Sequence, residues 1–420
     1  MDFKPNPLIY GANEDFLSSF KLTITMNSLV QHKTLTDAVA KAMIRYPYFS
    51  VCPERKGNSI VLKHNTQPMP VFEDDRCVTL GTQETNGHLL TFGCEGSKII
   101  LNASHYIADG MGIMPLLKTV LYLYVSELYG ENGLDSKKIN IPNEPVMKEE
   151  YEYPFNKKFE KPDSLWFAKK VPENVYSPCC DKDDDDVLYS YHLHIPQKAM
   201  MQIANPSDGS PVSFLLVMMY RALCCLDDKI EKAVVAHVQH QYRSVLNAPV
   251  SRHSLVSYIP VVLPPKAKDW NVERQNTVVR GQVIINSEPE ADICAINRLV
   301  SVLPDDDSVS LEEKKQAMRN FVDQSIKQKT FGISYVGKAD WSGLEQYVED
   351  IHAYIGEKYT QSMFIIEVMT IGEDFTINFM QKGRTSRFVD AFAQQLKSFD
   401  IPVVIVGGEE YSLCDTKIPD

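Results

Sequence analysis

The segment from Ile99 to Tyr129 constrains the fold most strongly, because it joins an apolar strand to a long amphipathic helix through a short loop. Ile99–Ala103 (IILNA) has the character typical of a strand in the centre of a sheet. From Gly112 to Tyr129, apolar residues recur at helical spacing and form one broad face. A buried strand that leads into such a helix predicts an α/β protein, in which helices cover a sheet.

The same alternation of strands and helices continues on both sides of a polar crossover at 130–186. The crossover ends in the aspartate-rich run 181–186, which we interpret as a solvated turn. A metal site is the alternative, but consecutive carboxylates point in different directions. We predict strands at 20–26, 59–63, 188–195, 233–239, 331–337, 363–370, 375–380 and 403–406, and helices at 35–46, 213–226, 275–303, 311–325 and 385–398.

Length and composition predict a globular protein with two parts. The chain has 420 residues, of which 44% are hydrophobic and 23% charged, and this length is typical of two domains. We expect an N-terminal subdomain at 1–186, which contains the strand–loop–helix segment and the crossover, and a C-terminal subdomain at 187–420. No internal repeat is evident, although each half has its own strands and helices.

Charge and apolar content argue against several classes of partner. The net charge of −12 gives no general attraction for nucleic acids or anionic membranes. The first sixteen residues lack the apolar stretch of a signal peptide, and the apolar run 212–226 is short for a membrane span and contains Arg221. The nine cysteines show no zinc-ligand spacing, so we expect reduced thiols, no metal site and a cytoplasmic location.

The loop after the apolar strand carries the clearest chemical signal, His105-x-x-x-Asp109-Gly110. An imidazole that removes a proton needs a fixed orientation and an accessible ring nitrogen, and a strand end fixes the backbone of His105. Asp109 can brace the loop through an ion pair. Gly110 permits a backbone geometry or a close approach that a Cβ atom would block. The pattern predicts a general base at the end of the strand.

The chain resembles the superfamily of chloramphenicol acetyltransferase, nonribosomal-peptide condensation domains, plant BAHD acyltransferases and alcohol acyltransferases, which share HxxxDG or HxxxD at this position. Arg45–Phe49 (RYPYF) resembles the R-H-P-x-L that ends their first helix, and Phe331–Gly337 (FGISYVG) resembles a late strand that faces their active-site channel. Two features differ: Ser104 stands where condensation domains usually have a first histidine, and the BAHD signature D-F-G-W-G is absent after Val336.

The resemblance implies two α/β subdomains in a V with a central channel, and acyl transfer from a thioester to a hydroxyl or amine. His105 would be the base, and no cofactor is expected besides acyl-coenzyme A as co-substrate. Ser334 is the candidate oxyanion donor, and Asp109 is expected to pair with Arg243 in a structural role. The donor is coenzyme A or an acyl carrier protein. The alternative function is a non-catalytic relative that binds a carrier-tethered chain or a protein partner in the same cleft.

Other residues with chemical potential receive simpler interpretations. His192 and His194 lie two apart on a predicted strand and so share one face, which we expect to be exposed to solvent rather than to bind a metal. His240, after another strand, is assigned no role. The three tryptophans are expected to be packing groups: Trp166, Trp270 and Trp341.

Overall fold

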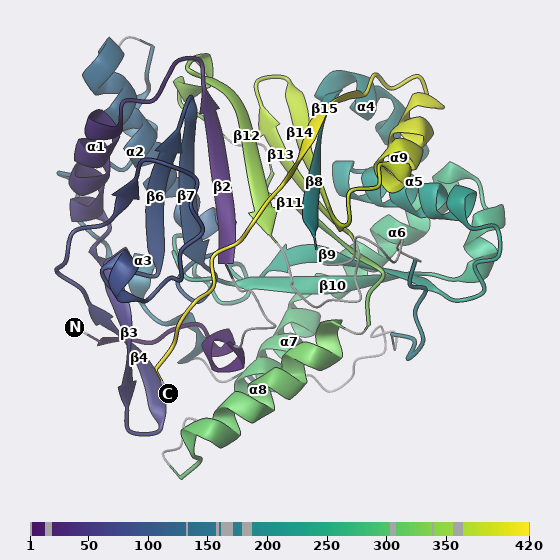
Figure 1. Ribbon diagram of the computed structural model, residues 1–420. Helices are drawn as coiled ribbons and strands as arrows, with labels where there is room; N and C mark the ends of the chain where they lie inside the picture. Colours follow the sequence, from purple (N-terminus) through teal and green to yellow (C-terminus); the bar gives the residue numbers. More distant parts are fainter. Residues whose placement is uncertain are drawn as a thin grey trace.

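A computed structural model describes residues 2–12, 19–131, 133–156, 159–160, 171–178, 187–302, 308–326, 328–337, 340–355 and 364–419. Within these residues, two large sheets lie side by side with helices on their outer faces (Figure 1). A third, small sheet consists of β1 (Asp2–Phe3), β4 (Ser59–His64) and β3 (Val51–Lys56). The aspartate run 181–186 and Trp166 lie outside the described residues.

The N-terminal sheet has five strands in the order β12 (Val348–Ile355), β2 (Ser19–Met26), β7 (Lys98–Ser104), β6 (Leu90–Glu95) and β5 (Val71–Phe72). Helices α1 (His32–Arg45) and α2 (Gly110–Tyr129) cover one face. Apolar residues of β2, such as Leu22 and Ile24, point toward these helices, and the intervening Lys21 and Thr23 are also buried. The opposite face of this sheet is therefore polar but covered.

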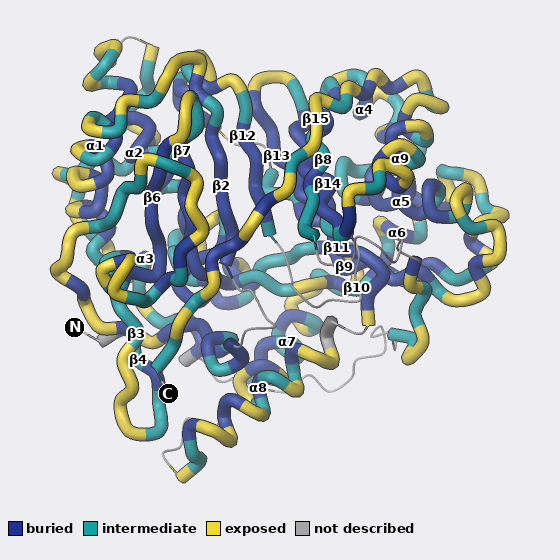
Figure 2. The backbone as a smooth tube through the Cα atoms, in the orientation of Figure 1, coloured by how far each residue is buried: buried dark blue, intermediate teal, exposed yellow. Residues whose placement is uncertain are grey.

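The C-terminal sheet has seven strands in the order β10 (Val256–Leu263), β9 (Val234–Gln241), β11 (Phe331–Tyr335), β13 (Phe364–Ile371), β14 (Asp374–Lys382), β8 (Leu188–Pro196) and β15 (Val404–Glu410). The central strands are buried along most of their length (Figure 2). Phe364, Phe379 and Phe388 pack together in its core. The other helices are α3 (Lys148–Tyr151), α4 (Gln197–Ala204), α5 (Pro211–Leu226), α6 (Val272–Asn286), α7 (Pro289–Val302), α8 (Leu311–Ile326) and α9 (Arg387–Lys397).

Two segments of the second half of the chain join the first half. Strand β12 comes from the second half but pairs antiparallel with β2, with Ile355 opposite Phe20. The last described residues, 411–419, leave β15 and cross to the first half, where Leu80 forms a parallel bridge with Thr416. We call residues 411–419 the C-terminal strap. The sheets therefore do not divide at residues 186/187, because both β12 and the C-terminal strap join the N-terminal half.

The predicted α/β fold is confirmed, and the predicted strands and helices correspond to observed elements, with the interval 275–303 divided into α6 and α7. Among the described residues, α2 has the length and apolar composition of a membrane-spanning helix, but 61% of its most apolar stretch is buried inside the protein. Helices α4 and α5 pass the same test only as a pair, across a bend of 84°. Burial of α2 is what the core helix of a layered fold requires.

Candidate active site

His105 begins the turn that connects β7 to α2. Its ring packs against Phe20 of β2, with the ring centroids 4.6 Å apart and the planes tilted by 44°. His105 is partly exposed, whereas Ser104 and Tyr106 on either side are buried. Burial of the ring lowers the pKa of His105, while the Asp109 carboxylate and the Ala108 backbone act in the opposite direction. The lowered pKa favours a neutral imidazole, which is the form that accepts a proton.

Asp109 caps the N-terminus of α2 and is buried in a dense set of hydrogen bonds. Arg243, just after β9, donates Nη2 to Oδ1 at 2.7 Å and Nη1 to Oδ2 at 2.8 Å. The backbone N–H groups of Gly112 and Leu255 donate to the same carboxylate at 2.7 and 2.9 Å. Both carboxylate oxygens are thus engaged with protein donors, so Asp109 can position the loop but cannot readily contact a substrate.

The close approach predicted at Gly110 occurs instead at Gly112. A Cβ atom on Gly110 would meet no heavy atom within 4 Å, and its φ lies outside the left-handed region, so the predicted reason for glycine there is wrong. At Gly112, a Cβ atom would collide with the backbone carbonyl of Arg252. The first turn of α2 and the segment around Arg252 can therefore pack this closely only because residue 112 is glycine.

Ser334, the predicted oxyanion donor, is buried on β11, and its hydroxyl group donates to Glu367 Oε1 of β13 at 2.9 Å. Burial raises the pKa of Glu367 to about 8, although the hydrogen bond from Ser334 opposes this rise. Ser334, Glu367, Asn378 and His192 lie opposite one another on adjacent strands β11, β13, β14 and β8. These four residues form a polar row across the face of the C-terminal sheet that is turned away from its helices.

A pocket of about 350 Å³ lies beside the first turns of α2. Its lining also includes residues 138–140, Arg252, the two residues that follow β11 and the end of β13, and His105 is not one of the lining residues. Its charged members are Lys118, Lys138, Arg252 and Asp340, so positive charge exceeds negative charge. Met111 and Met369 contribute apolar wall. A ligand with an apolar body and an anionic group would suit this lining.

The interpretation of His192 and His194 as an exposed strand face is wrong, because β12 covers that face. His194 Nε2 lies 2.8 Å from Asp350 Oδ2, and His352 Nε2 lies 3.2 Å from the same oxygen. The His192 ring stacks on His352 with centroids 3.9 Å apart. The described residues contain no group of histidine, cysteine and acidic side chains arranged to hold a metal ion. This cluster joins the two sheets.

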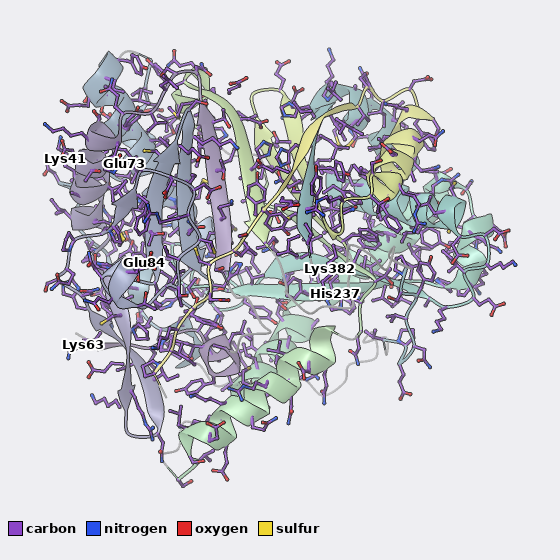
Figure 3. The ribbon with its side chains drawn as sticks, in the orientation of Figure 1. Lys41, Lys63, Glu73, Glu84, His237 and Lys382 are labelled. Atoms are coloured by element: carbon purple, nitrogen blue, oxygen red, sulfur yellow. The ribbon has the colours of Figure 1, made fainter. Side chains whose placement is uncertain are left out.

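Two histidines on β9 lie on opposite faces of the strand. His237, labelled in Figure 3, stacks on Tyr258 with ring centroids 5.8 Å apart, and burial lowers its pKa to about 3. His240 instead contacts Asp292 of α7, with Nε2 3.0 Å from Oδ1. Trp341 is buried and donates to the Thr370 carbonyl at 3.1 Å, whereas Trp270 is partly buried against Arg274.

Glu367 is the residue near the predicted site that the sequence interpretation missed. Its signal is visible in β13, FIIEVMTI, where one carboxylate interrupts an apolar strand. A carboxylate in a buried strand requires a hydrogen-bond partner or a proton, so it marks a position of chemical interest. Its contact with Ser334 arises from parallel pairing of β11 and β13, which the sequence alone does not specify.

No protein-family model and no curated protein sequence matches this chain. Solved structures do match over nearly the whole length. Fusarium graminearum TRI101 complexed with coenzyme A and deoxynivalenol has a TM-score of 0.59 at 11% sequence identity, covering 95% of this chain and 97% of that chain. The condensation domain of the monacolin K polyketide synthase MokA has a TM-score of 0.56 at 11% identity, with the same coverage.

A third similar structure is polyketide synthase associated protein 5 from Mycobacterium tuberculosis, with a TM-score of 0.53 at 12% identity, covering 92% of this chain and 97% of that chain. At these identities, the similarity establishes the fold. It confirms the resemblance predicted from His105, Asp109 and the flanking elements at the level of architecture. The chain therefore has the two-subdomain α/β fold of these solved structures.

Proposed function

We propose that this protein is an acyltransferase that moves an acyl group from a thioester to a hydroxyl or amine acceptor, with His105 as general base. The observation that carries the proposal is the state of His105: its pKa is lowered by burial, yet the residue is partly exposed at the start of the turn before α2. A neutral imidazole with access to substrate is what proton removal from a neutral nucleophile requires.

The reaction needs no covalent enzyme intermediate. His105 accepts the proton from the acceptor as its oxygen or nitrogen attacks the thioester carbonyl carbon. The carbon–sulfur bond then breaks, and the leaving thiolate takes the proton from the imidazolium. Because the thioester is already activated, positioning and one base can supply much of the acceleration. Asp109 and Arg243 support this step indirectly, since their ion pair fixes the loop that carries His105.

Ser334 is proposed to donate to the oxyanion, and its contact with Glu367 sets a condition on that role. The Ser334 hydroxyl group can point to a substrate only when it does not donate to Glu367. With a pKa of about 8, Glu367 retains its proton at neutral pH and can donate to Ser334 Oγ instead. The hydroxyl hydrogen is then available for the developing negative charge on the thioester oxygen.

Coenzyme A is the donor that the surroundings favour, with a carrier protein as the other thioester source. The similar TRI101 structure was determined with coenzyme A, and the pocket beside α2 has excess positive charge from Lys118, Lys138 and Arg252. These cations suit a phosphate-bearing arm. No metal or further cofactor is needed for the proposed chemistry.

The test is thiol release from a panel of acyl-coenzyme A thioesters in the presence of a metabolite extract, with products identified by mass spectrometry. We expect His105→Ala to reduce turnover about 100- to 10,000-fold, the range for loss of a general base, while the melting temperature stays close to that of the parent. His64→Ala, on the exposed end of β4, is the matched control and should retain full turnover. Equal turnover in His105→Ala and the parent would remove His105 as the base.

A further inference from the structure

The C-terminal strap is attached to the loop that precedes β6 by backbone hydrogen bonds. The Leu80 N–H group donates to the Asp415 carbonyl at 2.8 Å, and Lys417 N–H donates to the Leu80 carbonyl at 2.8 Å. Gly81 has φ +81°, and a Cβ atom there would lie 2.7 Å from the Lys417 carbonyl oxygen. The strap therefore lies close against this loop at a fixed register.

The same register brings together Cys77 and Cys414, which stand near opposite ends of the sequence. Their thiol groups share a hydrogen bond, and the Val78 N–H group donates to the Cys414 sulfur. The Ser19 hydroxyl group donates to the Cys414 carbonyl, which holds the backbone on its other side. The two side chains are thus adjacent because of backbone pairing on both segments.

The surroundings of the two thiols differ in a way that suits oxidation. Cys77 is exposed to solvent, whereas Cys414 is 1% exposed and belongs to the core of the N-terminal half. The hydrogen bond from Cys414 lowers the pKa of Cys77, and the nearby Lys21 acts in the same direction, while partial burial of the thiol, Asp415 and Asp75 oppose it. An accessible sulfur with enhanced thiolate character next to a second thiol is the arrangement in which sulfenic acids resolve to disulfides.

We infer that Cys77 and Cys414 are a reversible thiol–disulfide site that covalently anchors the C-terminal strap to the N-terminal subdomain. With hydrogen peroxide as oxidant, the Cys77 thiolate attacks one peroxide oxygen, the O–O bond breaks, and the departing hydroxide leaves as water with the proton that the Cys77 thiol lost on ionising. Cys414 then attacks the Cys77 sulfur of the sulfenic acid. The S–O bond breaks, and hydroxide leaves as a second water with the Cys414 proton. A thiol reductant reverses the bond by exchange.

The bond would connect both halves of the molecule. The C-terminal strap continues directly from β15, which pairs with β8 in the C-terminal sheet, and Tyr411 donates to the Ile355 carbonyl of β12 at 3.0 Å. Anchoring residue 414 to residue 77 therefore closes a loop that contains most of the chain. Such a long cross-link restricts the unfolded chain strongly, so the oxidised protein should unfold at a higher temperature.

The test is oxidation of the full chain with hydrogen peroxide, followed by alkylation of free thiols and tryptic digestion without reductant. We expect a linked pair of peptides, 77–98 and 398–417, that disappears after treatment with a thiol reductant. Fragment spectra must assign the bond to Cys77, because Cys94 lies in the same tryptic peptide. Thermal unfolding should occur at a higher temperature in the oxidised than in the reduced protein.

Three variants separate this site from the other thiols. Cys77→Ser, at an exposed position, and Cys414→Ser should each abolish the linked peptide and the difference in unfolding temperature. Cys225→Ser, an exposed thiol on α5, should retain both. The inference is overturned if the oxidised parent carries oxygen adducts on Cys77 with no link to Cys414, or if Cys77 is linked to another cysteine.

Discussion

The chemistry at the scale of single residues depends on burial more than on residue type. His105 and Glu367 are both ionisable, and desolvation favours the neutral form of each, lowering one pKa and raising the other. The neutral form of His105 can accept a proton, and the neutral form of Glu367 can donate a hydrogen bond to Ser334. The sequence identified His105 through its motif. Glu367 belongs to no motif, and its raised pKa follows from burial that only the fold reveals.

Glu367 should leave a signature in the pH dependence of stability. Its folded-state pKa of about 8 lies above its ordinary value, so the folded state binds the extra proton between the two. The stability contributed by the protonated form is fully present below about pH 4.5 and decreases as pH rises through about 8. The unfolding temperature of Glu367→Gln should therefore decrease less steeply with rising pH over this range than that of the parent.

The same residue offers a test of the proposed role of Ser334. If protonated Glu367 frees the Ser334 hydroxyl hydrogen, turnover in the parent should decline as pH rises above about 8. Glu367→Gln, whose amide N–H₂ still donates to Ser334 Oγ, should not show this decline, and Ser334→Ala should lower turnover at every pH by about 10- to 1000-fold. Identical pH profiles for turnover in the parent and in Glu367→Gln would contradict the assignment.

At the scale of elements, α2 is held in place at its N-terminus by contacts from the segment between β9 and β10. The Asp109–Arg243 pair is buried, and Leu255 and Gly112 donate to the same carboxylate. Removing one member of a buried pair leaves an uncompensated charge, which typically costs about 3–5 kcal/mol. The pair therefore contributes to positioning His105 and to stability together.

Asp109→Ala should reduce both the melting temperature and the turnover of the protein, because Arg243 would remain buried without its partner. Arg243→Lys keeps the charge but loses the bidentate fork, so it should lower both quantities less than Asp109→Ala. Calorimetry and thiol release on the same preparations measure the two effects. A stable but inactive Asp109→Ala would instead indicate direct participation in the chemistry.

Helices and strands were predictable from the sequence where a local pattern of apolar residues specifies them. The strand β7 and helix α2 are specified by an apolar run and a helical face, and both were predicted. Strand β12 was missed, because it is partly polar and is stabilised by pairing with β2 from the other end of the chain. The exposure of His194 was mispredicted for the same reason, since the sequence does not reveal which segment covers a strand face.

At the scale of the whole molecule, polar contacts join the two sheets in addition to β12 and the C-terminal strap. Asp350 of β12 lies between His194 of β8 and His352 of its own strand. The hydrogen bond to Asp350 raises the pKa of His194, and both histidines lower the pKa of Asp350. His192, stacked on His352, is disfavoured in its charged form, and burial lowers its pKa to about 4.

The signs of these pKa shifts predict how the contacts of Asp350 with His194 and His352 respond to pH. Stability from His194 is fully present below its ordinary pKa of 6.5 and is lost as pH rises through its raised folded-state pKa. Stability from Asp350 is present above its ordinary pKa of 3.8 and is lost as pH falls through its lowered one. His192 opposes His194, because protonation below about pH 6.5 favours the unfolded chain.

Asp350→Asn should therefore destabilise the protein by about 1–3 kcal/mol, the range for hydrogen bonds to charged groups, and more at pH 6 than at pH 8.5. At pH 6, His194 is charged and loses its carboxylate partner, whereas a ring that has lost its proton at higher pH can still hydrogen-bond to the amide. Chemical denaturation at the two pH values measures the difference. Asp374→Asn is the control, because Asp374 acts on His194 only through its charge and does not hydrogen-bond to it; this variant should change stability little. An equal loss of unfolding free energy at both pH values would mean that the Asp350 carboxylate stabilises the contact between the two sheets without depending on the charge of His194.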